Sequence, residues 1–226
     1  MMQELVLLGD CCEVTASPSS DLFADLASDA TGTPVVTPAD VGVTGRIEAS
    51  TLRRLPETPV GLNRYRLSPG DLMLVRLGAV GRVALVEEPA RDQGWAYHSS
   101  CMRIRPDIEQ VDPSYLSAYL THPPVADQLL SFAQVGTVPS LTMSALKGLP
   151  VALPDLRTQR LLAGALGEVA HQADIQRRML ARLDAVRQGL FTQLLGEDFP
   201  DTGASRPKGP LPERRAPRTR RTNRMS

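Results

Sequence analysis

The sequence is poor in the residues that most catalytic and metal sites use. Its 226 residues include three cysteines, three histidines and two lysines, and aromatic residues make up only 4%. It holds no P-loop, no GxSxG elbow, no HExxH pair and no Asn-Pro-Pro-aromatic signature. His98, His122 and His171 have no cysteine or aspartate at ligand spacing. These absences predict a protein with no catalytic residues, no metal site and no cofactor of its own.

Long apolar runs are also missing. No stretch approaches the length of uncharged apolar sequence that a membrane span needs, and the first ten residues carry Glu4 and Asp10 where a secretion signal would be basic. We therefore expect no membrane association and a cytoplasmic location. The cysteines are odd in number and two of them, Cys11 and Cys12, are adjacent, so we expect these thiols and that of Cys101 to be reduced.

The charge is balanced overall but unevenly distributed. The formal net charge is zero, yet residues 204–226 hold eight basic residues against one acidic residue. The rest of the chain therefore has an acidic excess of seven, and any nucleic-acid site within it must be a local basic patch. Residues 197–226 are rich in arginine and proline and almost free of large apolar residues, so we expect a disordered basic tail.

Residues 1–154 have the pattern of a mixed α/β (α+β) domain. Short apolar or β-branched runs alternate with turn residues, and Ser68-Pro69-Gly70-Asp71 has turn chemistry. One helix is predicted at about 113–132, capped by Asp112 and broken by the prolines at 123 and 124. The runs that we expect to form strands are QELVLLG, TPVVTPADVG, DLMLVRLG, GRVALVEE and SSCMRIRP.

Residues 155–196 are predicted to form one long helix. They contain no proline between Asp155 and Leu195, and nine positions spaced alternately by three and four residues are apolar at seven places. These seven seam residues are Leu166, Val169, Ala173, Leu180, Leu183, Leu190 and Leu194. Such a seam predicts a coiled coil with a helical partner. The alternative is a helical hairpin that turns near Gly164 or Gly167 and folds back on its own domain.

Five segments resemble the specificity subunits of type I restriction-modification systems, and they follow one another along the chain in the order typical of that family. The most specific is VGTVPSLTMSALKGLPVALPDLRTQR at 135–160, which is similar to the segment that closes a target-recognition domain in that family. The others are LGDCCEV at 8–14, GTPVV at 32–36, PGDLMLVR at 69–76 and GLFTQLL at 189–195. The resemblance implies a non-catalytic subunit for phage defence, with a DNA target-recognition domain and a helix that docks methyltransferase subunits. Those subunits would bind S-adenosylmethionine, and a restriction/translocase subunit is the further partner that the family implies.

Candidate DNA contacts lie in the basic stretch 44–66, which the resemblance places where base contacts are expected. Arginine can pair with guanine and asparagine with adenine, each through two hydrogen bonds. The candidates there are Arg46, Arg53, Arg54, Asn63, Arg64 and Arg66. A second candidate loop, 134–140, contributes Gln134 and Thr137. Any of these arginines can also be an ordinary solvated surface residue, and the second loop can simply close the domain.

The family usually has two recognition domains and two long helices, and this sequence has one of each. We expect a half-sized subunit that pairs with itself or with a second specificity chain. Two other functions stay open. The acidic excess of residues 1–150, 17 acidic against 11 basic residues, favours a coiled-coil scaffold that binds no DNA. A dimeric DNA-binding regulator is the third reading, although no helix-turn-helix spacing is evident.

Overall fold

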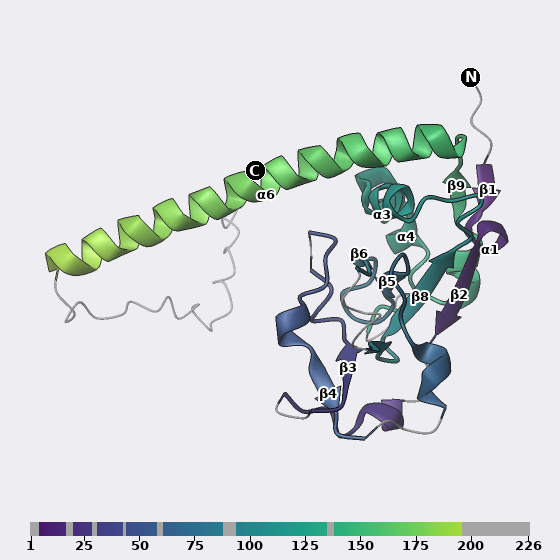
Figure 1. Ribbon diagram of the computed structural model, residues 1–226, viewed down its shortest axis with the longest axis horizontal. Coiled ribbons are helices and arrows are strands. Elements are labelled where there is room, and N and C mark those ends of the chain that lie inside the picture. Colours follow the sequence, from purple (N-terminus) through teal and green to yellow (C-terminus); the bar gives the residue numbers. More distant parts are fainter. Residues whose placement is uncertain are drawn as a thin grey trace, which may run out of the picture. The chain divides into compact units, whose positions relative to one another are not determined.

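A computed structural model describes residues 5–16, 20–28, 31–42, 44–57, 61–87, 94–134 and 138–195 (Figure 1). The chain divides into two compact units, Met1–Ala173 and Asp174–Ser226, and each is described by itself. The strands are β1 (Leu5–Leu7), β2 (Cys12–Ala16), β3 (Thr33–Val36), β4 (Arg53–Leu55), β5 (Leu72–Val75), β6 (Val83–Leu85), β7 (Ala96–Tyr97), β8 (Cys101–Pro106) and β9 (Pro150–Ala152). The α-helices are α1 (Leu8–Cys11), α3 (Pro113–Thr121), α4 (Pro123–Ser131), α5 (Met143–Lys147) and α6 (Leu156–Leu195), with 3₁₀ turns η1 (Ser20–Phe23), η2 (Ala49–Thr51) and η3 (Leu62–Tyr65).

A four-stranded antiparallel sheet of order β2-β8-β5-β6 forms the middle of the first unit. Both of its faces are covered by a hydrophobic core. Successive side chains of a strand point to opposite faces, so neighbouring residues belong to different cores. On β5, Leu72 and Leu74 belong to one hydrophobic core, and Met73 and Val75 belong to the other. In Figure 1, α3 and α4 lie on one side of β5 and β6, and β3 and β4 lie on the other.

The second layer consists of a three-stranded sheet and the 3₁₀ turns. Its strand order is β4-β3-β7, with β4 antiparallel and β7 parallel to β3. Gly32 lies so close to β4 that a Cβ there would meet the Leu55 carbonyl oxygen at 1.9 Å. Phe23, Leu62, Tyr65 and Trp95 are among the side chains that pack this layer onto the central sheet. The mixed α/β architecture predicted from the sequence is confirmed.

The sequence also predicted the breaks between elements. The Asp112 carboxylate accepts hydrogen bonds at 3.0 Å from the backbone N–H groups of Ser114 and Tyr115, so it caps α3. The helix expected at 113–132 is broken as predicted, since α3 ends at Thr121 and α4 begins at Pro123. Gly70 has a φ of +89°, and the Asp71 N–H donates to the Ser68 carbonyl at 3.0 Å, so the predicted turn is present.

The predicted long helix is confirmed as α6, 40 residues from Leu156 to Leu195. Asp155 begins it, because its carboxylate accepts from the Thr158 N–H at 3.0 Å and from the Thr158 hydroxyl at 2.7 Å. These bonds lower the pKa of Asp155 from its ordinary value. The alternative of a hairpin near Gly164 or Gly167 is wrong, because α6 continues through both glycines and no side chain crowds either one.

Three further predictions concern the cysteines, membrane association and the tail. Cys11, Cys12 and Cys101 are buried and form no disulfide, and burial raises the pKa of Cys101 to about 12. Among the described residues, no helix has the length and hydropathy needed to cross a membrane. The tail predicted at 197–226 lies outside the described residues.

Candidate nucleic-acid interface

The candidates from the 44–66 stretch all lie in the second layer, on three different pieces of backbone. Arg53 and Arg54 are in β4, where they pair with Val35 and Pro34 of β3. Arg46 follows the tight loop in which the Gly42 N–H donates to its carbonyl at 2.9 Å. The remaining three lie in η3 or directly after it, and η3 packs beside β7 at the opposite edge of the three-stranded sheet from β4: Asn63, Arg64 and Arg66.

These side chains differ in how free they are to meet a ligand. Arg46, Arg53, Asn63 and Arg64 are exposed. Arg54 and Arg66 are half-buried: Arg54 Nη1 donates to the Gly32 carbonyl at 3.1 Å, and Arg66 Nη1 donates to the Gly94 carbonyl. The exposed four are therefore the stronger candidates for base contacts, and the other two also hold loops in place.

The candidate arginines of the 44–66 stretch differ in their charge partners from the arginines of β8, Arg103 and Arg105, which pair with carboxylates. Among the described residues, Arg46, Arg53, Arg54, Arg64 and Arg66 form no ion pair with a carboxylate. Within the described part of the chain, no carboxylate therefore competes with a DNA phosphate or base edge for these guanidinium groups.

The second candidate loop lies at the end of the β5–β6 hairpin. The Gln134 N–H donates to the Ser140 carbonyl at 2.8 Å, and the Leu141 N–H donates to the Arg76 carbonyl at 2.9 Å. Arg76 Nη1 in turn donates to the Ser99 carbonyl at 3.5 Å. Gln134 is exposed, whereas Thr137 lies outside the described residues. DNA contact by either residue stays a prediction.

The turn at 98–100 lies beside β3. His98 donates its N–H to the Val36 carbonyl at 2.9 Å, and its ring lies tilted by 49° against that of Phe23, with centroids 5.1 Å apart. Burial, with the positive charge of Arg53 as the second cause, lowers the pKa of His98 from its ordinary value. The guanidinium of Arg53 therefore lies within electrostatic reach of His98.

We expect Arg53→Ala to raise the pKa of His98, although burial will still keep it below the ordinary value. Because folded His98 binds its proton less readily than the unfolded chain does, it reduces stability as the pH falls through the ordinary histidine pKa of about 6.5. Arg53→Ala should weaken that loss. NMR titration of His98 measures the shift, with Arg64→Ala as the control. An unchanged pKa in Arg53→Ala would contradict the placement.

Two arginines of β8 that the sequence pattern did not single out face the second layer. On β8, Met102 and Ile104 face the helix-covered core, so Arg103 and Arg105 face the second layer. Arg103 is only 4% exposed. Its Nη2 donates to Glu13 Oε1 at 2.9 Å and to Thr15 Oγ1 at 3.4 Å, and its Nη1 donates to backbone carbonyls of η3. Neither the family segments nor the basic stretch pointed to it.

Arg105 holds the turn that follows η3. Its Nε and Nη2 donate to the two carboxylate oxygens of Asp71 at 2.7 and 2.8 Å. The same carboxylate accepts from the Ser68 N–H at 2.7 Å. Asp71 is buried, so this two-point pair fixes the turn to the central sheet.

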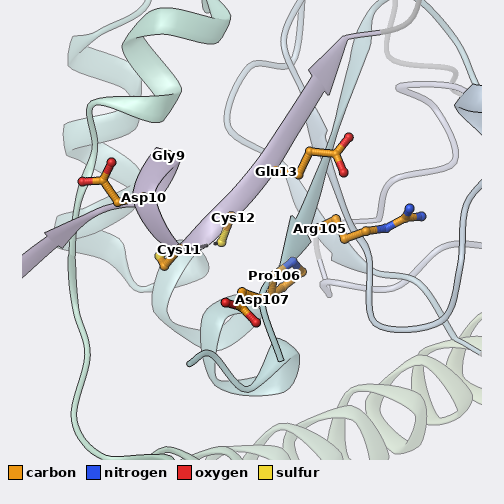
Figure 2. A pocket seen from close by; sticks show the side chains of 8 residues that line it. All are labelled: Gly9, Asp10, Cys11, Cys12, Glu13, Arg105, Pro106 and Asp107. Carbon is orange, nitrogen blue, oxygen red and sulfur yellow. Dashed lines mark hydrogen bonds between the residues drawn. The ribbon is translucent and has the colours of Figure 1, made fainter. Parts of the chain in front are cut away.

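A pocket of about 340 Å³ opens at the junction of α1, β2 and the end of β8 (Figure 2). Cys11 and Cys12 line it with their sulfur atoms 3.9 Å apart, and their contact lowers the pKa of Cys11 and raises that of Cys12. The other lining residues are Gly9, Asp10, Glu13, Arg105, Pro106 and Asp107. Three carboxylates against one paired arginine make this pocket unsuitable for a phosphate group, and it contains none of the candidate DNA residues.

The seam residues of α6 present an apolar surface. Leu180 is 62% exposed and Leu183 is 57% exposed. Leu166, Val169, Leu190 and Leu194 are exposed as well, and Ala173 is half-buried. Met179, which precedes Leu180, and Val186, which precedes Arg187 at a polar position of the same three-and-four spacing, are also exposed and widen this surface. Pairing through the seam stays a prediction.

Comparison with known proteins gives the class. The family model described as type I restriction modification DNA specificity domain matches residues 4–185. The chain belongs to this family. The specificity subunit of the Escherichia coli type I restriction enzyme EcoBI is 23% identical over 154 residues, which are 66% of this chain and 32% of that protein.

Solved structures agree with this assignment in their fold. The HsdS subunit from Thermoanaerobacter tengcongensis matches 91% of this chain and 52% of its own length, with a TM-score of 0.60 and 22% identity. A chain from a structure concerning complex assembly and conformational transition of the type I R-M system matches 83% of this chain and 43% of its own, with a TM-score of 0.61 and 19% identity. This chain thus spans half or less of most of these relatives.

Proposed function

We propose that the chain reads one half of a bipartite DNA sequence and positions DNA methyltransferase subunits on it. The family match over residues 4–185 carries this proposal. The exposed side chains of Arg46, Arg53, Asn63 and Arg64 support it, because guanidinium and amide groups can pair with guanine and adenine in the major groove.

The chain contributes no catalytic group in this proposal. A base inside a duplex has to leave the stack before it can be methylated, and the pocket that receives it belongs to the methyltransferase. S-adenosylmethionine binds to that partner as well. The role of this chain is to fix where on the DNA the methyltransferase acts.

The exposed apolar surface of α6 provides the contact to other subunits. The seam residues pair with a second long helix, from another copy or from a different specificity chain. Met179 and Val186 flank the seam and offer additional area to a methyltransferase subunit or a restriction/translocase subunit. If two identical chains pair antiparallel, the two recognition domains are related by a two-fold axis, and the target is an interrupted palindrome.

A scaffold that binds no DNA is the second candidate. The acidic excess of residues 1–150 favours it, since a negative body repels phosphate. The two candidates predict different outcomes when the chain is mixed with a random DNA library: a specificity subunit enriches one sequence motif, and a scaffold enriches none.

The test is selection from such a library by the full chain in complex with its methyltransferase partner, followed by mapping of methylated bases. We expect one bipartite motif, and Arg53→Ala should relax a single position of it by about 1–3 kcal/mol. Arg182→Ala, which removes the same charge from an exposed site on α6, is the matched control and should keep the motif. Absence of any motif in the unmutated complex would support the scaffold.

A further inference from the structure

The Arg103 side chain donates hydrogen bonds to the backbone of the segment that carries candidate DNA contacts. Its Nη1 donates to the carbonyl of Arg66 at 3.0 Å and to that of Arg64 at 3.4 Å. These two carbonyls flank Tyr65, the last residue of η3. One buried guanidinium therefore reaches both sides of the turn.

The other end of the same guanidinium is tied to the central sheet. Nη2 contacts Glu13 and Thr15 of β2, and Thr15 is the direct cross-strand partner of Arg103. The Thr15 hydroxyl, which donates to the Glu13 carboxylate at 2.8 Å, lowers the pKa of Glu13 together with the charge of Arg103. The carboxylate thus stays ionised and keeps the guanidinium in one orientation.

η3 is a single short turn, and no side chain caps its N-terminus. Leu62 and Tyr65 of this turn are buried, and Tyr65 packs edge-on against Tyr97 with ring centroids 6.1 Å apart. The Leu67 N–H donates to the Trp95 carbonyl at 2.8 Å, and Arg66 donates to the Gly94 carbonyl.

Asn63 and Arg64 are exposed on this turn, and the Arg64 guanidinium lies 5.2 Å from the centroid of the Tyr65 ring. The positions of both side chains therefore depend on the backbone that Arg103 contacts.

We propose that Arg103 is a positioning residue for base reading: it fixes the backbone of η3 so that Asn63 and Arg64 meet the DNA in one geometry. This inference rests on the proposed function. Two-point contacts to a base edge require side chains held within a fraction of an ångström. Buried hydrogen bonds to the backbone behind those side chains can supply this precision. Arginine suits this role better than lysine, because its planar fork donates in several fixed directions at once.

The test compares library selections by the full chain in its methyltransferase complex. Asn63→Ala and Arg64→Ala first define which motif positions are read from η3, and Arg53→Ala defines a position read from β4. We expect Arg103→Met to lower preference about tenfold at the η3 positions and to leave the Arg53 position intact. Arg103→Lys should keep part of the preference at the η3 positions.

Met102→Ala is the matched control for general destabilisation. Met102 is the neighbouring buried residue of β8 but faces the helix-covered core. It should keep the whole motif. Hydrogen–deuterium exchange gives a readout without DNA: the amides of residues 62–67 should exchange faster in both Arg103 variants and at the unmutated rate in Met102→Ala.

The outcomes separate this inference from the function on which it rests. No motif with the unmutated complex overturns both. A motif that Arg103→Lys and Arg103→Met retain in full, with unchanged exchange at 62–67, overturns the positioning role alone. Equal loss of the motif in Met102→Ala also overturns it, since the effect would then come from general destabilisation. If Arg103→Met does not fold, Arg103→Lys decides by the same two measurements.

Discussion

The double substitution Leu180→Asp with Leu183→Asp should dissociate the chain from its helical partner. Both leucines are seam residues on α6 and are exposed in the single chain, so association would bury them. Two carboxylates in their place would have to lose water without gaining a partner, which costs several kcal/mol. The double variant should sediment as a monomer at concentrations where the unmutated chain is a dimer.

The matched control changes the same helix outside the seam. Ala181 and Ala185 are exposed and do not belong to the seam positions. Ala181→Asp with Ala185→Asp adds the same charge and should leave the dimer intact. If the unmutated chain is itself a monomer in sedimentation equilibrium, homodimerisation is wrong, and pairing with a second specificity chain remains to be tested by co-purification.

Gln159→Leu should destabilise the first unit strongly. Gln159 is 0% exposed, and its Oε1 accepts from the Asp112 N–H at 2.9 Å. Its Nε2 donates to the carbonyls of Gln110 at 2.9 Å and Pro154 at 2.8 Å. Leucine fills a similar volume but leaves these three backbone groups without their partner, which should cost about 2–4 kcal/mol of unfolding free energy.

Urea denaturation of the full chain measures this loss. Gln172→Leu is the control, because Gln172 is an exposed glutamine of the same helix whose side chain donates to the Glu168 carboxylate at 3.1 Å and to no backbone group of the described residues. It should change stability by less than about 0.5 kcal/mol. A loss that is equally small in Gln159→Leu would mean that water replaces the missing bonds.

Local chemistry made much of the fold predictable. The cap at Asp112, the break at Pro123, the turn at Gly70 and the long helix after Asp155 each depend on residues only a few positions apart. The short helix α1 was missed, because its first two residues, Leu8 and Gly9, end the run QELVLLG that was predicted to form a strand.

The candidate site was predictable only in its exposed part. A basic stretch can be identified from the sequence, and four of its six candidate residues are exposed. Arg103 and Arg105 were not predictable, because alternating arginines in a strand normally face solvent. Their partners Glu13 and Asp71 lie 90 and 34 residues away along the chain, and only the folded sheet brings them together.

The two-faced central sheet has a consequence for how such a protein can change over time. Because neighbouring residues of β5 belong to opposite cores, the sheet separates the core covered by α3 and α4 from the core beside β4 and η3. Substitutions at exposed positions of β4 and η3 leave the packing of α3, α4 and Gln159 untouched. On the proposed function, a change of target sequence through β4 and η3 would therefore leave the packing of the helix-covered core in place.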